Sequence, residues 1–133
     1  MSILKGDKKW LEKKSKEIDE LLESWNTART LIGKNNVIIC KAINKEEDIW
    51  WAILTDVDGS HVKREFGINA SSYGFIKMNF SNLYGLENKK EILDDIFGQF
   101  QLEDSLWDGI DVLLSDVKDL SIVLSKLDQY VPW

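Results

Sequence analysis

Apolar residues recur every three or four positions along residues 10–32, with charged residues between them. That period places the apolar side chains on one stripe of a helix. Asp7 lies where an N-cap is expected, and Gly33 lies where a helix usually ends. The pattern therefore predicts a long amphipathic N-terminal helix, whose apolar stripe consists of Trp10, Leu11, Ile18, Leu21, Leu22, Trp25, Ala28 and Ile32.

The pattern changes after residue 36 to short runs rich in β-branched and aromatic residues, at 37–43, 49–55 and 61–67. Such runs predict strands. Asp58 and Gly59 stand between the second and third runs, and an Asp-Gly pair there predicts a hairpin. Residues 37–67 are therefore expected to form an antiparallel meander. Residues 68–72 are then expected to form a loop, and residues 75–80 a fourth strand.

Helical spacing returns in the last third of the chain. Asn88 and Glu91 have the spacing of a capping box, which predicts a helix over 88–99. A second helix is expected over 104–117 and a fifth strand over 120–124. The chain as a whole predicts a single α+β domain over residues 1–133, ordered as a long helix, an antiparallel meander and then strand, helix, helix, strand.

Charge is distributed unevenly along the 133 residues, which carry a net charge of −6. Residues 1–34 have a balance of +2, whereas residues 87–133 hold four basic and eleven acidic groups, a balance of −7. An acidic surface repels nucleic acid and attracts basic proteins. We therefore expect a basic protein partner and no nucleic acid. The competing interpretation is an acidic face that serves only solubility.

The longest apolar run has six residues, against the roughly 20 that a membrane-spanning helix needs. The first residues resemble no signal peptide, and Cys40 is the one cysteine, so no internal disulfide is possible. These features predict a cytoplasmic protein that is a monomer or homodimer and does not bind membranes.

Motifs for catalysis are missing from the sequence. With one histidine, a nucleophilic dyad would have to join His61 to Cys40, and an exposed hairpin histidine is the commoner arrangement. There is no glycine-rich phosphate loop and no nucleophile elbow. We therefore expect no enzyme activity, no cofactor and no metal.

Acidic residues in the expected second helix form the candidate binding site. Asp104, Asp108 and Asp111 are spaced four and three apart, so they would share one helix face. Like charges on one face repel, and either a basic partner or a metal ion would relieve that repulsion. Trp107 beside them would serve either as an aromatic anchor for a partner or as a core residue. The expected partner-binding residues are Glu103, Asp104, Trp107, Asp108 and Asp111.

Two adjacent tryptophans, Trp50 and Trp51, occupy one expected strand and must therefore point to opposite faces. One should enter the core, while the other must be exposed or covered. This arrangement favours an alternative function, a non-catalytic structural or adaptor domain that acts as a homo-oligomer and buries one of the two rings.

Residues 75–125 resemble part of the barstar family of ribonuclease inhibitors. The resemblance rests on Phe97 with Gly98, on the run Leu106, Trp107, Asp108, and on the expected order strand, helix, helix, strand. It implies that Asp108 enters a nuclease active site, where it is supported by Trp107. More broadly, the chain is similar to bacterial immunity proteins that neutralise polymorphic toxins or the toxins of contact-dependent growth inhibition. This similarity implies an inhibitor of a cognate toxin, with a nuclease as its target.

Overall fold

The computed structural model describes residues 7–34, 36–43, 48–57, 62–80, 90–104 and 110–130. Within these ranges the chain folds as a mixed α+β structure, which confirms the expected fold class. The elements in chain order are α1 (Lys8–Leu31), β1 (Ile38–Ile43), β2 (Ile49–Val57), β3 (Val62–Ser71), β4 (Phe75–Phe80), α2 (Lys90–Phe97), β5 (Gln101–Asp104), β6 (Ile110–Leu114) and α3 (Val117–Tyr130).

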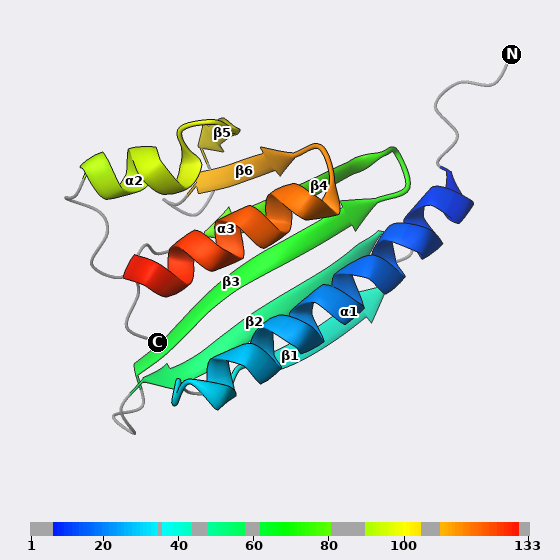
Figure 1. The fold of residues 1–133 in the computed structure, drawn as a ribbon. Helices are drawn as coiled ribbons and strands as arrows, with labels where there is room; N and C mark the ends of the chain where they lie inside the picture. The colour runs from blue at the N-terminus through cyan, green and yellow to red at the C-terminus, as the bar shows by residue number, and fades with distance from the viewer. Residues whose placement is uncertain are drawn as a thin grey trace, which may run out of the picture.

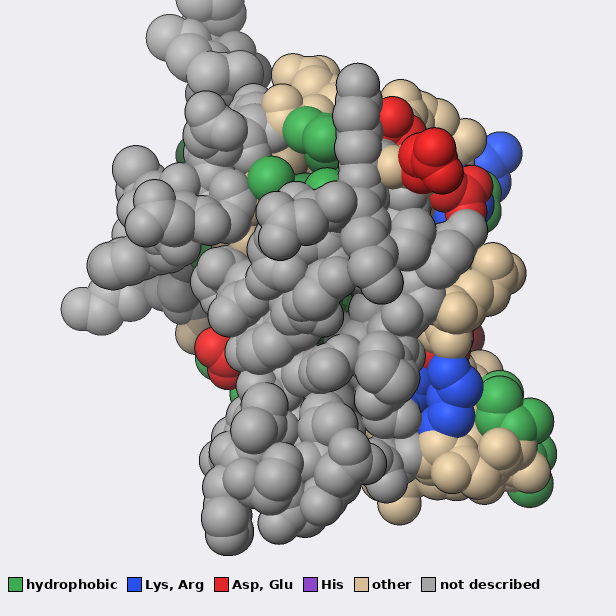
Figure 2. Space-filling model, turned by 90° about the vertical axis from the view of Figure 1, so that its left-hand side faces the viewer, with side chains coloured by type: hydrophobic (Ala, Val, Ile, Leu, Met, Phe, Trp, Pro, Cys, Tyr) green, Lys and Arg blue, Asp and Glu red, His purple; other side chains and the backbone are tan. Residues whose placement is uncertain are grey.

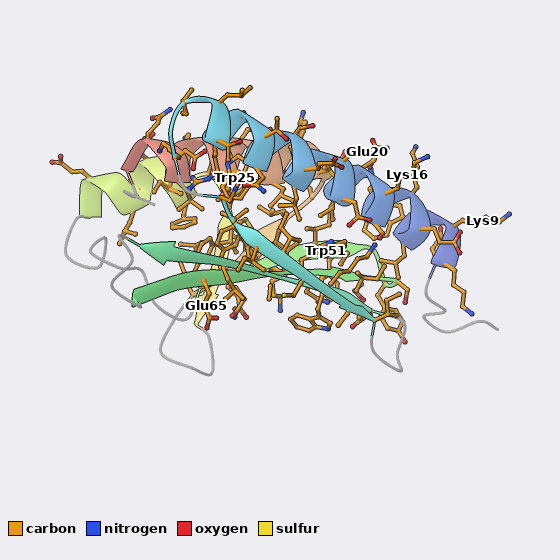
Figure 3. The ribbon with its side chains drawn as sticks, turned by 90° about the horizontal axis from the view of Figure 1, so that it is seen from below. Lys9, Lys16, Glu20, Trp25, Trp51 and Glu65 are labelled. Carbon is orange, nitrogen blue, oxygen red and sulfur yellow. The ribbon has the colours of Figure 1, made fainter. Side chains whose placement is uncertain are left out.

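The strands form one antiparallel sheet in the order β1-β2-β3-β4-β6-β5. The three helices lie on one face of this sheet, with α1 over the β1 side and α2 over the β5 side (Figure 1). A view from below shows the same two layers, with the helices above the strands (Figure 3). The opposite face carries no helix among the described residues, and we call it the open face.

Helix α1 begins and ends as its sequence predicts. The Asp7 side chain accepts a hydrogen bond from the backbone N–H of Trp10 at 3.0 Å. The backbone N–H of Asp7 donates to the carbonyl of Ser72, so the start of the helix is fixed to the turn between β3 and β4. Gly33 follows the helix with a φ of 82°, a conformation that glycine adopts without strain.

Strands β1 to β4 form the expected meander, with one correction. Residues 68–72 were expected to be a loop, whereas β3 continues through Ser71 and pairs with both β2 and β4. Small polar residues alternate with Ile68 and Ala70 there, and they resemble a loop in sequence. The turn residues 58–61 lie outside the described part of the chain.

The expected order after β4 is wrong in two places. The predicted helix over 104–117 is replaced by strand β6, and the predicted strand over 120–124 lies inside helix α3. In β6, Val112 and Leu114 are buried while Asp111 points to the open face, which is the two-residue period of a strand. The four fully buried residues of α3 instead follow a helical period, and they are Leu120, Val123, Leu124 and Leu127.

The core lies between the sheet and the helices. A row of aromatic rings runs through it from α1 to α2, with centroids 6.3 Å, 5.5 Å and 5.3 Å apart along Trp25, Phe66, Phe80 and Phe97. The row joins the two sides of the sheet, because the two middle rings belong to β3 and β4 and the outer two to the helices that cover opposite sides.

Helices α1 and α3 run in the same direction and are tied at both ends. Near their starts, Lys14 donates to Asp116 at 2.7 Å. Near their ends, Asp128 accepts hydrogen bonds from the Trp25 indole and from the guanidinium of Arg29, whose side chain is only 1% exposed. A buried charge needs a partner of opposite sign, so the pair of Arg29 with Asp128 fixes how α3 sits against α1.

Candidate functional site

The structure places the expected site residues on strands rather than on one helix face. Asp111 is on β6, and Glu103 and Asp104 are on β5. Trp107 and Asp108 lie outside the described residues. Glu103 is the register partner of Asp111, so these two positions are neighbours on the open face. The order of elements implied by the barstar resemblance, strand, helix, helix, strand, is not the order in the structure.

Asp111 is held by its own chain. Its carboxylate accepts a hydrogen bond from the Asn79 side chain and lies 3.8 Å from the Lys77 ammonium. The Asp111 side chain is 18% exposed. Because two groups of β4 already satisfy and partly neutralise it, Asp111 contributes less free negative charge to the surface than its sequence position suggests.

Further carboxylates lie on α2, directly before the outer strand β5. Glu91 and Asp94 are exposed and have no ion pair among the described residues, whereas Asp95 lies 3.4 Å from Lys126. In Figure 2 acidic side chains gather at the upper right, at the end of the molecule where α2 lies. We call Glu91, Asp94, Glu103 and Asp104 together the acidic edge.

Cross-strand register builds one row across the whole open face. From β1 to β5 its members are Cys40, Ala52, Gly67, Asn79, Asp111 and Glu103. At its β1 end the row is made of small residues, and a hollow of about 340 Å³ opens over them. The hollow is lined by Cys40, Ala42, Trp50, Ala52 and Gly67, with Glu65 and Asn79 among its polar groups.

Trp50 and Trp51 point to opposite faces, as adjacent strand residues must. Trp51 enters the core with 1% of its surface exposed, and its indole donates to Asp19 at 2.9 Å. Trp50 stands on the open face, 43% exposed, beside Ala42 of β1. The sequence shows that the two rings separate, but it does not show which of them is buried.

The hollow was missed in the sequence because it depends on which strands are neighbours. Ala42, Ala52 and Gly67 belong to three different strands, and only the register brings them together. The signal available in the sequence is weak. It is a small residue on the outward-facing side of each of three consecutive strands.

Possible metal ligands do not cluster in the described part of the chain. Among the described residues there is no group of three or more histidine, cysteine, aspartate or glutamate residues that could hold a metal ion. Cys40 is exposed on β1, while His61 lies outside the described part of the chain. In the helices that are described, no segment is both long and apolar enough to cross a bilayer.

The ion pair of Lys14 with Asp116 is the one described contact that clearly changes proton affinities. Its hydrogen bond holds the pKa of Asp116 below the ordinary value and raises the pKa of Lys14 above its own. The pair lies on the helical side of the molecule, away from the open face. We therefore assign it a structural role.

Comparison with protein-family models, with curated proteins and with solved structures finds no match to this chain. The charge of the acidic edge and the shape and exposure of the open face are therefore the features from which a function can be inferred.

Proposed function

We propose that the protein is an immunity protein, a non-catalytic inhibitor that binds and neutralises a basic bacterial toxin, with a nuclease as the target class. The observation that carries the proposal is the separation of charge in the fold. Glu91 and Asp94 of α2 are exposed and have no ion pair among the described residues, and the strand that follows, β5, carries Glu103 and Asp104, whereas α1 mixes both signs.

A nuclease needs a basic cleft to bind phosphates, and such a cleft attracts a clustered acidic surface. Clustering matters because an encounter is steered by the local field rather than by net charge alone. The acidic edge also contains an outer strand, β5, which has a described partner on one side only, β6. Toxin association is therefore expected to be fast at low salt and to slow as salt rises.

The experiment compares two triple variants that remove equal charge from different places. The edge variant is Asp94→Asn, Glu103→Gln and Asp104→Asn. The matched control is Glu12→Gln, Glu20→Gln and Glu23→Gln on α1, where Figure 3 shows Glu20 pointing away from the sheet. Asp111 is left intact because it also holds Asn79 and Lys77. The toxin is first captured from the lysate of the native host at low salt, then purified.

The edge variant should associate with the toxin about tenfold more slowly at low salt, with a flatter salt dependence, because steering by clustered charge contributes a factor of roughly 10 to 1,000. The α1 variant should remain close to the wild type. Recovery of the toxin's enzymatic activity in the presence of the edge variant, but not the control, would link binding to neutralisation. Equal losses in both variants would contradict the assignment of the edge as the binding surface.

A further inference from the structure

Strand β1 forms the other edge of the sheet, and its surface is apolar. Ile38 and Ile43 are 63% and 68% exposed, and β1 pairs only with β2 among the described strands. An exposed edge strand presents unpaired backbone N–H and C=O groups that match those of another strand. We propose that two copies of this chain pair through β1, antiparallel about a two-fold axis at Cys40, so that their sheets become continuous. This inference is independent of the proposed inhibitor function.

Charge favours a second copy at this edge. Lys41 is the one charged residue of 36–43, and its ammonium is bound to Asp19 of its own chain at 2.7 Å. A strongly charged partner therefore finds no counter-charge on this strand. Pairing through β1 also puts the two acidic edges at opposite ends of the joined sheet, roughly 50 Å apart at about 4.8 Å per strand. That distance exceeds the Debye length of about 8 Å, so two copies of net charge −6 meet with little repulsion.

The register follows from symmetry. A two-fold axis perpendicular to the sheet keeps each side chain on its own face, so the numbers of two facing residues have an even sum. Two registers that meet this condition pair most of β1 in one copy with β1 in the other. The register centred on Lys41 sets two like charges directly opposite each other, which is destabilising. The register centred on Cys40 sets Lys41 opposite Ile39 of the second copy instead, so it is the favoured one.

Shape agrees with the same register. With Cys40 at the axis, Ile38 of one copy lies opposite Ala42 of the other, on the open face. Ala42 is beside Trp50, and both line the hollow. The exposed Ile38 side chain thus meets the place where small residues leave space next to an exposed indole. Symmetry repeats this contact, so the two hollows are each covered by the partner's isoleucine.

The joined edge is short, because β1 has six residues. An interface of this length falls below the roughly 1,200 Å² typical of stable complexes, so we expect a reversible dimer in the micromolar range. Analytical sedimentation of the full chain measures the dissociation constant of this dimer. The protein concentrations should run from about 1 to about 100 µM, which brackets the expected value.

Cysteine cross-linking tests the register. Under mild oxidation the wild-type chain should form a covalent dimer through Cys40, because residues facing each other across strands are close enough for a disulfide. The control is Cys40→Ser with Ala42→Cys, which moves the thiol to another exposed position of the same strand. In the proposed register those thiols are roughly 13 Å apart and should cross-link at least about tenfold more slowly.

A second variant tests the surface without cysteine chemistry. Ile38→Glu should weaken self-association about tenfold or more, since each 1.4 kcal/mol is a factor of ten and the charge would be buried against Ala42 and Trp50. Leu102→Glu, at the exposed apolar position of the opposite edge, should leave it unchanged. Melting curves check that both variants fold. Any one of three results would overturn the proposal. They are a protein that is still monomeric at about 100 µM, equal cross-linking at positions 40 and 42, and an Ile38→Glu variant that dimerises as strongly as the wild type.

Discussion

The two edges of the sheet differ in nearly every respect that matters for binding. The β1 edge is apolar and neutral, with exposed isoleucines and a hollow beside it. The β5 edge is short and acidic, and it follows a helix that carries further carboxylates. One row of residues, from Cys40 to Glu103, connects them across the open face. The net charge of −6 therefore describes neither edge, and the two proposed partners, a basic toxin and a second copy of the chain, would bind at opposite ends of the sheet.

The largest expected effect concerns the two tryptophans next to the β1 edge. Trp51→Ala should lower the free energy of unfolding by about 3–5 kcal/mol, because it removes a fully buried ring from beneath α1. Trp50→Ala should cost about 1 kcal/mol or less, because that ring stands on the open face. Chemical denaturation of both variants measures the difference. Similar losses would mean that the open face near β1 is packed as tightly as the core.

The next largest effect tests whether the two edges of the sheet unfold together as one cooperative unit. Asp128→Ala leaves the buried guanidinium of Arg29 without its carboxylate and should lower stability by about 3 kcal/mol. If α1 and α3 hold both sides of the sheet together, unfolding should remain a single transition at lower denaturant. Gln129→Ala, at the next and exposed position of α3, is the control. Two separate transitions in the Asp128 variant would instead divide the β1 side from the β5 side.

A smaller, stabilising effect is expected within the row that joins the edges. A Cβ at Gly67 would lie 3.8 Å from the Asn79 side chain and from the Trp51 carbonyl, which is ordinary contact. Gly67→Ala should therefore raise stability by about 0.5–1 kcal/mol, since glycine inside a strand costs that much relative to alanine. Gly74→Ala should lower stability, because Gly74 has a φ of 95°. A destabilised Gly67→Ala variant would show that the row of residues across the open face does not tolerate a side chain at position 67.

The smallest effect is the pH dependence of the ion pair between Lys14 of α1 and Asp116, which directly precedes α3. The lowered pKa of Asp116 means that the Lys14 contact stabilises the fold above about pH 4, the ordinary aspartate value, and is lost as the pH falls through the lowered pKa of the folded state. Asp116 is half exposed, so the contribution should stay below about 1 kcal/mol.

The measurement compares the free energy of unfolding of the wild type with that of Lys14→Met between about pH 6 and about pH 2.5. This range spans the ordinary pKa values of carboxyl groups. The stability difference between the two proteins should shrink on acidification, because protonation of Asp116 removes the interaction that the variant already lacks. A difference that stays constant with pH would show that Lys14 acts through its aliphatic stem alone.

Local patterns predict the parts of this fold that local physics determines. The long period-3.6 stripe, the cap at Asp7 and the glycine at position 33 predict α1 correctly. Residues 110–124 were predicted wrongly because short apolar runs fit both periods, and β6 is decided by its pairing with β4 and β5. That pairing joins residues far apart in the sequence, so no window of neighbouring residues contains it.

The candidate site shows the same limit. The sequence locates the acidic region, but it expects Asp111 on a helix with Asp104 and Asp108. In the structure its neighbours are Asn79 and Lys77, 32 and 34 positions earlier. Whether a carboxylate is free or already paired depends on such contacts. The sequence therefore predicts where charge is concentrated but not which carboxylates remain available to a partner.

The pair of Arg29 with Asp128 spans 99 positions of the chain. During synthesis α1 therefore leaves the ribosome well before the carboxylate that binds its guanidinium is made. Closing so long a loop is entropically costly, so we expect this contact to form late in folding. A chain truncated before Asp128 would lack the carboxylate that the buried Arg29 side chain binds, so it should be less stable and more readily degraded by proteases.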